Sequence, residues 1–255
     1  MVPIDLFDDI ELYPITVGVR LSCRGFDVPE DESNLVHKAA RAFFSRTGIE
    51  KGISIKLLKN IPVAAGMGGG SSDAAATLLA LNAIYSHLLS SGELHNLAIQ
   101  LGADVPFFLY NRPSLITGIG EILKPLKDWP KFWYVIVTPP FKIATSWVYG
   151  KFKLQLTKEE DINILDRLKD SPPDLSEIIE NDLEQVTTVS FPIINTIKMS
   201  LFDAGAIGAL MTGSGPSVFG VFQNSDQAYR AKECLISQDM GDVFIATNWE
   251  VTDDQ

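Results

Sequence analysis

The sequence predicts an α+β protein whose chain folds in two halves. In each half, segments with the period-two alternation of strands stand among segments with helical periodicity. A length of 255 residues is enough for one large domain or two modest ones. We place the boundary near Lys131, which gives predicted domains at 1–131 and 132–255.

The first half is predicted to open with two short strands. Residues Ile10–Cys23 alternate, with turn-forming residues at Tyr13–Pro14. Residues Asn34–Thr47 carry apolar side chains on one helical face, and Gly48 ends that helix. The elements that follow are a strand at 53–58, helices at 74–90 and 93–101, and a hairpin at 115–123 that turns at 118–120.

The second half is predicted to begin with a short buried strand, Tyr134–Val137, that Pro139 and Pro140 close. The remaining elements are helices at 145–152, 161–168, 175–186 and 193–203, strands at 209–212 and 217–222, a helix at 226–237 and a strand at 243–247.

A glycine-rich run after the strand at 53–58 is the most informative part of the chain. It holds four glycines within five positions, Gly66, Gly68, Gly69 and Gly70. Glycines let backbone amides approach a ligand without a Cβ in the way. Ser71, Ser72 and Asp73 then supply N-cap chemistry for the helix. Because a helix N-terminus carries partial positive charge and unpaired N–H groups, the run predicts an anion cradle, and the expected anion is a nucleotide phosphate.

Three other interpretations of this run are weaker. The Walker A motif needs a lysine after its last glycine, and none is present here. The dinucleotide fingerprint G-x-G-x-x-G has a different spacing, and no acidic residue closes a following strand. Flexible linkers are also rich in glycine and serine, but a linker is not bracketed by an apolar strand and an alanine-rich helix.

The run resembles the phosphate loop of the GHMP kinase superfamily, and four further stretches share the likeness in order and spacing. They are Leu101–Leu109 (L-G-A-D-V-P-F-F-L), Gly118–Leu123 (G-I-G-E-I-L), Asn181–Glu184 (N-D-L-E) and Met211–Phe219 (M-T-G-S-G-P-S-V-F). The first two of these resemble the branch that phosphorylates 4-diphosphocytidyl-2-C-methyl-D-erythritol. The likeness covers nearly the whole chain.

The resemblance implies a two-domain GHMP kinase fold. The expected parts are an N-terminal ribosomal-protein-S5-like nucleotide-binding domain, a C-terminal ferredoxin-like domain and a site in the cleft between them. The implied activity is transfer of phosphate from ATP, with Mg²⁺, to the 2-hydroxyl of this cytidine diphosphate-linked polyol. That reaction belongs to the methylerythritol phosphate route to isoprenoid precursors.

The resemblance also assigns candidate site residues. Asp104 matches the aspartate that accepts the hydroxyl proton of the substrate, although the residues alone favour an N-cap for the turn at Pro106. Gly213 and Ser214 lie in a second glycine turn, which is by itself a tight connection between strands and by resemblance lines the cleft. The expected ATP-binding residues are Pro62, Val63, Ala64, Ala65, Gly66, Met67, Gly68, Gly69, Gly70, Ser71 and Ser72.

Several polar residues near these motifs have more ordinary interpretations. A hydroxyl of Ser71 or Ser72 is expected to reach Mg²⁺ or to cap the helix, and both roles can coexist. Asp73 is expected to complement the helix dipole as a first-turn acid rather than to bind metal. For Asn34 and Lys59, the resemblance implies contacts with the adenine. The residues alone are equally consistent with a helix cap at Asn34 and a solvated strand end at Lys59. The histidines have no metal-ligand spacing, so no protein metal ligands are predicted.

The sequence departs from the superfamily branch at its beginning. Members begin with P-A-K-x-N-L and G-Y-H segments, which in the family supply a lysine that assists catalysis and residues that hold the cytidine. Neither segment occurs here. Met1 is therefore expected to be an internal methionine taken as a start, or the result of a true truncation, and the coding sequence upstream would decide between them.

Charge and composition exclude several function classes. The net charge of −11 argues against a nucleic-acid partner, which needs a basic surface. No apolar run approaches bilayer length, and no signal peptide is visible. Two isolated cysteines give neither a disulfide framework nor a zinc site. We expect a cytoplasmic enzyme without nucleic-acid or membrane partners, and the sequence leaves the oligomeric state open.

Two rival functions remain open from the sequence. One is another kinase of the superfamily that acts on mevalonate, homoserine or a sugar. The other is a nucleotide-binding protein without phosphoryl transfer, which the missing lysine segment makes plausible for the chain as written.

Overall fold

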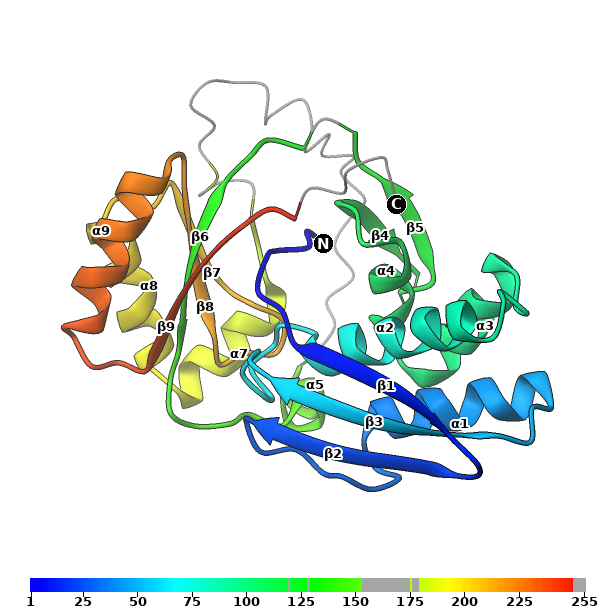
Figure 1. Ribbon diagram of the computed structural model, residues 1–255. Helices are drawn as coiled ribbons and strands as arrows, with labels where there is room; N and C mark the ends of the chain where they lie inside the picture. Colours follow the sequence, from blue (N-terminus) through cyan, green and yellow to red (C-terminus); the bar gives the residue numbers. More distant parts are fainter. Residues whose placement is uncertain (119, 128, 153–174, 176–178, 250–255) are drawn as a thin grey trace. The chain divides into compact units, whose positions relative to one another are not determined.

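The computed structural model describes residues 1–118, 120–127, 129–152, 175 and 179–249, and the chain divides into two units (Figure 1). Unit 1 comprises Met1–Val63, Gly68–Lys127 and Trp249–Gln255, and unit 2 comprises Ala64–Met67 and Asp128–Asn248. The glycine-rich run is therefore divided, because its segment Ala64–Met67 groups with unit 2 and its remainder with unit 1. Each unit is described by itself below.

Unit 1 contains a mixed sheet with the strand order β1-β3-β2. Strand β1 (Asp9–Ile15) pairs antiparallel with β3 (Gly52–Lys59), and β2 (Val19–Gly25) pairs parallel with β3. Parallel neighbours need a crossover connection, and helix α1 (Leu35–Thr47) supplies it. The strand predicted before the glycine run is confirmed as β3.

The predicted turn at Tyr13–Pro14 is wrong, because Pro14 lies inside β1 in register with Ile53. A proline cannot donate a ladder hydrogen bond, so it is confined to edge strands, and β1 is an edge strand of this sheet. The chain turns later, at Gly18, which has a φ of +82°.

Helix α1 is confirmed at nearly its predicted bounds, and its caps explain them. The Asn34 side chain accepts a hydrogen bond from Val36 N at 2.9 Å, so it acts as the N-cap. Gly48 takes the left-handed conformation at the C-cap, where a residue with a Cβ would be strained. Of the two roles open for Asn34, the structure shows the helix cap.

Helix α2 (Gly69–Ile84) begins five residues earlier than predicted. Its N-cap position is Gly68 in the left-handed conformation, and no side chain caps it among the described residues. Ser71, Ser72 and Asp73 are therefore helical residues and not N-caps, which corrects the prediction. The physical reason is that left-handed Gly68 turns the chain into the helix before the serines are reached.

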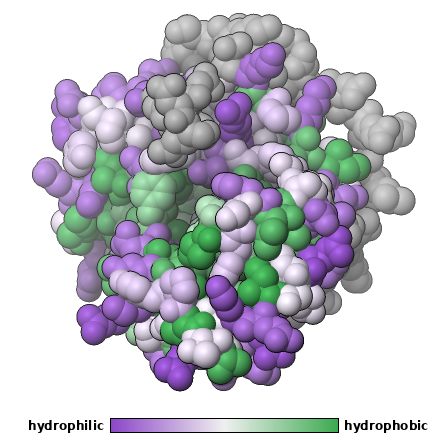
Figure 2. All heavy atoms as spheres, turned by 45° about the vertical axis from the view of Figure 1, so that its right-hand side comes forward, coloured by the Kyte–Doolittle hydropathy of each residue, from purple (hydrophilic) through white to green (hydrophobic). Residues whose placement is uncertain are grey.

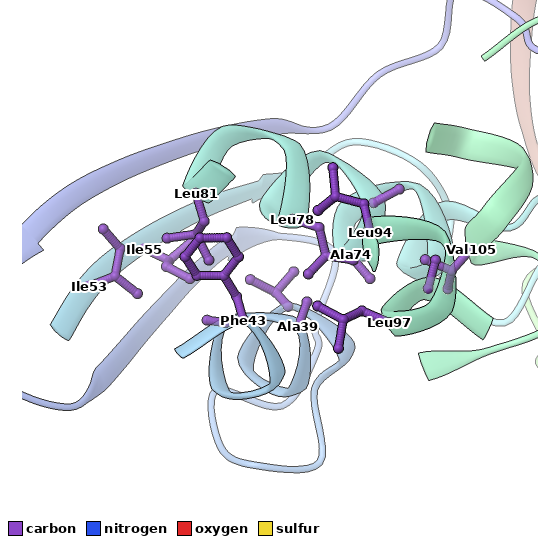
Figure 3. Packing of buried hydrophobic residues seen from close by; sticks show 14 of the residues in the cluster. Ala39, Phe43, Ile53, Ile55, Ala74, Leu78, Leu81, Leu94, Leu97 and Val105 are labelled. Atoms are coloured by element: carbon purple, nitrogen blue, oxygen red, sulfur yellow. The ribbon is translucent and has the colours of Figure 1, made fainter. Parts of the chain in front are cut away.

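The core of unit 1 lies between the sheet and its helices (Figure 3). Fully buried side chains from α1, β3 and α2, such as Phe43, Ile55 and Leu78, meet there. Helix α3 (Ser91–Leu101) adds Leu94 and Leu97. Burial of this apolar surface holds α2 rigidly against β3, which fixes the position of its N-terminus.

Two short elements complete unit 1. Helix α4 (Val105–Tyr110) packs on α2, and strands β4 (Ser114–Thr117) and β5 (Ile122–Pro125) form the predicted hairpin. The α3 helix ends at Gly102 as predicted.

Unit 2 contains an antiparallel sheet with the order β7-β8-β6-β9. Its strands are β6 (Trp133–Thr138), β7 (Gly208–Met211), β8 (Val218–Phe222) and β9 (Asp242–Thr247). Helices separate β6 from β7 and β8 from β9. This β-α-β-β-α-β order is the ferredoxin-like arrangement, so that prediction is confirmed.

The described helices of unit 2 are α5 (Thr145–Lys151), α7 (Asp182–Ser190), α8 (Ile193–Asp203) and α9 (Ser225–Ile236). The structure places α7 later than the predicted helix at 175–186, because Asn181 caps it and sets its start. The predicted helix at 161–168 lies outside the described residues.

Figure 2 shows one face of the molecule, on which apolar and hydrophilic side chains are interspersed. Single exposed apolar residues of this kind are normal for folded proteins. Among the helices that the structure describes, none is long and apolar enough to span a membrane.

Candidate active site

The N-terminus of α2 presents backbone amides that the helix itself does not use. Its first internal hydrogen bond runs from Ser72 N to Gly68 O at 2.9 Å. The amides of Gly69, Gly70 and Ser71 precede that bond and are the groups an anion would meet. Gly70 is exposed and Ser71 is half-buried, so solvent and ligand can reach this turn.

The glycines of the run are needed for packing against the protein itself. A Cβ on Gly68 would lie 3.0 Å from the Phe108 ring of α4. A Cβ on Gly69 would lie 2.8 Å from Lys59 Nζ and 3.0 Å from Ile61 Cγ2. At Gly69, which is buried, the absence of a side chain therefore serves contact with the interior.

In unit 2, Gly66 of the segment Ala64–Met67 contacts the second glycine turn. Thr212 Oγ1 donates to Gly66 O at 2.9 Å. A Cβ on Gly66 would lie 1.9 Å from Thr212 O, and a Cβ on Gly213 would lie 2.9 Å from Gly66 O. Gly66 also has a φ of +77°, which favours glycine. The structure thus brings Gly66 and Gly213 together.

Side chains of unit 2 hold the second glycine turn in place. Asn181 Nδ2 donates to the carbonyls of Met211 and Gly213, both at 2.8 Å, and Asn181 Oδ1 caps α7. Ser214 is buried, and its hydroxyl lies 3.0 Å from Thr145 Oγ1. The N-D-L-E stretch therefore supports this turn, a role that its sequence alone did not reveal.

Asp104 stands at the N-cap position of α4, but its side chain makes no capping hydrogen bond to the described residues. Asp104 is an exposed residue. Neighbouring protein atoms nevertheless displace part of the water around its carboxylate, and this desolvation raises the pKa of Asp104 above its ordinary value. A Cβ on Gly120 would lie 2.4 Å from Ala103 O, so the hairpin turn packs against the residue before Asp104.

A small cavity lies where residues of α3, the start of α4 and the hairpin meet. Its volume is about 70 Å³, and it is lined by Ile99, Ala103, Pro106 and Glu121. Ligand pockets usually measure roughly 300 Å³ or more, so this cavity is too small for a nucleotide.

Two models of one kinase family match the chain, and each covers part of one half. The model of the GHMP kinases N terminal domain matches residues 34–112, and the model of the GHMP kinases C terminal matches residues 162–240. The chain is also 46% identical over 235 residues to the 4-diphosphocytidyl-2-C-methyl-D-erythritol kinase of Syntrophus aciditrophicus, covering 92% of this chain and 84% of that protein.

The chain belongs to the 4-diphosphocytidyl-2-C-methyl-D-erythritol kinase family of GHMP kinases. A crystal structure of 4-(cytidine 5'-diphospho)-2C-methyl-D-erythritol kinase matches with a TM-score of 0.82 and 34% identity, covering 98% of this chain and 89% of that chain. A homoserine kinase from Cytophaga hutchinsonii matches with a TM-score of 0.79 and 22% identity, covering 96% of this chain and 87% of that chain. At this identity the match shows a shared fold alone. The two-domain GHMP kinase fold predicted from the sequence is confirmed.

In this GHMP kinase, sequence reasoning missed a buried charged cluster in unit 1. Lys59 is 4% exposed and pairs with Asp8 and, at 3.0 Å, with Asp73. Lys59 is therefore not a solvated strand end, and Asp73 is not a first-turn acid, because the helix begins at Gly69. Burial raises the pKa of Asp73 to about 7, Asp8 adds to the rise and Lys59 opposes it.

Proposed function

We propose that this protein catalyses the ATP-dependent phosphorylation of the 2-hydroxyl of 4-diphosphocytidyl-2-C-methyl-D-erythritol. This is a step of the methylerythritol phosphate pathway to isoprenoid precursors. The observation that carries the proposal is the 46% identity to a kinase of that name over 92% of the chain. The open amides at the start of α2 support it, since they suit a polyphosphate.

The reaction needs positioning and charge stabilisation more than covalent chemistry by the protein. The proposed ATP-binding residues are Pro62–Ser72, with the amides of Gly69, Gly70 and Ser71 facing phosphate oxygens. The substrate hydroxyl oxygen attacks the γ-phosphorus as the bond to the bridging oxygen breaks, and ADP leaves. Asp104 accepts the hydroxyl proton. Gly213 and Ser214 are proposed to line the site, supported by the contact between Gly213 and Gly66.

Mg²⁺ is proposed to enter with ATP. Within the described residues, no group of three or more His, Cys, Asp or Glu side chains is placed to hold a metal ion. Mg²⁺ takes water and substrate phosphates as most of its ligands, so one serine hydroxyl of Ser71 or Ser72 fits as the protein's share. The ion would neutralise phosphate charge; Asp73 is engaged by Lys59 and is not a proposed ligand.

The acid side of the pH profile tests the role of Asp104. The base must be ionised, so activity is lost as the pH falls through its pKa. Because desolvation raises the pKa of Asp104, we expect log kcat/KM to fall at a pH above the ordinary aspartate value of 3.8. Initial rates measured from pH 4 to 8 check this. A profile that stays flat to the lower limit would contradict the assignment.

A substrate panel tests the proposed function itself. Purified protein is incubated with ATP and, separately, with 4-diphosphocytidyl-2-C-methyl-D-erythritol, mevalonate or homoserine, and ADP release is measured. We expect turnover of the cytidyl compound alone. Turnover of mevalonate or homoserine in its place would overturn the proposal, and ATP binding without any transfer would favour a nucleotide-binding protein.

The predicted assignment of the two domains is part of the same proposal. Residues 1–131 are proposed as the ATP-binding domain and 132–255 as the second domain, and the two family models match on either side of residue 131. A cytoplasmic location without nucleic-acid or membrane partners also stays a proposal, which rests on the sequence arguments given above.

A further inference from the structure

The cluster formed by Asp8, Lys59 and Asp73 has no role in the proposed chemistry. All three side chains are almost inaccessible, with Lys59 at 4%, Asp8 at 2% and Asp73 at 5% exposed in their ion pairs. Burying charges is costly unless they are paired, so a cluster of this kind calls for an explanation.

The cluster joins the two ends of the glycine run within unit 1. At the entry, Asp8 Oδ1 accepts hydrogen bonds from Asn60 N at 2.6 Å and Ile61 N at 2.8 Å, which orders the chain just before Pro62. At the exit, Asp73 lies in the second turn of α2. Lys59 bridges the two carboxylates, so entry and exit are tied through one ammonium group.

Lys59 also contacts Gly69, the first residue of α2. A Cβ on Gly69 would lie 2.8 Å from Lys59 Nζ, which means that the ammonium packs against the glycine's main chain. The amide of that glycine is one of those proposed to face phosphate. A shift of Lys59 therefore moves the binding turn itself.

A direct contact between Lys59 and phosphate does not suit this geometry. The ammonium is enclosed, and its two carboxylate partners leave the cluster with no net positive charge to offer an anion. Any effect of Lys59 on the phosphate groups therefore passes through the main chain of Gly69.

We propose that Lys59, held by Asp8 and Asp73, is a positioning residue that fixes the backbone amides at the start of α2 in the geometry that binds ATP. The inference rests on the proposed function, because it assumes that these amides meet phosphate. Lys59 thus acts on the binding turn from the protein interior and does not itself contact phosphate.

The test is the Lys59→Met variant, with the binding of a non-hydrolysable ATP analogue and of 4-diphosphocytidyl-2-C-methyl-D-erythritol measured separately by calorimetry. Misplaced binding groups can cost up to about a hundredfold, so we expect the Kd for the nucleotide to rise about tenfold or more. The Kd for the cytidyl compound should stay within about twofold, because it does not depend on this turn. A merely structural role would weaken both.

Two further variants keep the test decisive. Lys56→Met is the matched control, because Lys56 lies on the same strand as Lys59. The Lys56 side chain is 62% exposed, and its Nζ lies 3.8 Å from Glu11 Oε2, which makes a weak surface ion pair. The nucleotide Kd of this variant should stay within about twofold of the wild-type value. If Lys59→Met fails to fold, the double variant Lys59→Met/Asp73→Asn removes one charge of each sign, and the same tenfold loss is expected.

A folded variant that binds the nucleotide as the wild type does would overturn the proposal, and so would an equal loss for both ligands. Because the readout is binding, a wild type that binds ATP without transferring phosphate would count against the proposed function. The comparison of nucleotide Kd between Lys59→Met and Lys56→Met would still test the positioning role.

Discussion

Asp104→Asn is expected to lower kcat by about 10²- to 10⁴-fold, the range that a positioned general base contributes. The amide is nearly the same size as the carboxylate but cannot accept the hydroxyl proton at neutral pH. Asp104 makes no capping hydrogen bond to the described residues, so the fold should lose little with it. The Kd for ATP should stay within about threefold, since the base is not a phosphate ligand. Steady-state rates and calorimetry measure the two quantities.

The matched control is Asp203→Asn. Asp203 is an exposed aspartate at the end of α8 and belongs to none of the motifs, so its removal should leave kcat unchanged. If Asp104→Asn weakened ATP binding as much as turnover, Asp104 would be acting on the nucleotide or the fold, and the role of base would be lost.

Gly66→Ala is expected to destabilise the protein by about 3 kcal/mol or more, as overpacking adds to left-handed strain. The added Cβ would lie 1.9 Å from Thr212 O at a residue with a φ of +77°. For a chain of 255 residues, that loss corresponds to a fall in Tm of about 6–12 °C. Differential scanning calorimetry checks it, and the nucleotide Kd should rise in whatever protein stays folded.

The Gly18→Ala variant separates the backbone strain of a left-handed residue from the steric clash of its added Cβ. Gly18 has a similar φ of +82°, but nothing lies within 4 Å of an added Cβ. Only the strain of about 1 kcal/mol remains, so Tm should fall by about 2–4 °C. Equal losses at the two glycines would mean that the contact between Gly66 and Thr212 does not constrain the loop.

Features governed by local chemistry were predictable from the sequence. Asn34 and Gly48 bound α1 because cap preferences depend on a few neighbouring atoms. Helix α8 occupies its predicted residues, and the glycines at 118 and 120 turn the hairpin. In each case the residue type sets the backbone conformation without help from distant parts of the chain.

Features that depend on distant contacts were not predictable. Lysine is a residue expected at the surface, and the partner that buries Lys59 lies 51 positions away at Asp8. Helix propensity disfavours glycine, so the sequence predicts a start for α2 at residue 74, five residues after its actual start at Gly69. The motif located Asp104, but the hairpin contact that packs beside it at Ala103 joins residues far apart in the chain.

The contact between Gly66 and the turn at Thr212–Gly213 has a consequence for how the protein can evolve. The atoms that would clash with a new side chain at Gly66 belong to the main chain of Thr212 and Gly215, which no side-chain substitution removes. Trimming a neighbouring side chain therefore cannot compensate for a substitution at position 66. Genetic suppressors of such a substitution should instead change the number of residues in one of the two turns. We therefore expect Gly66 and the turn at Thr212–Gly213 not to change through successive single substitutions.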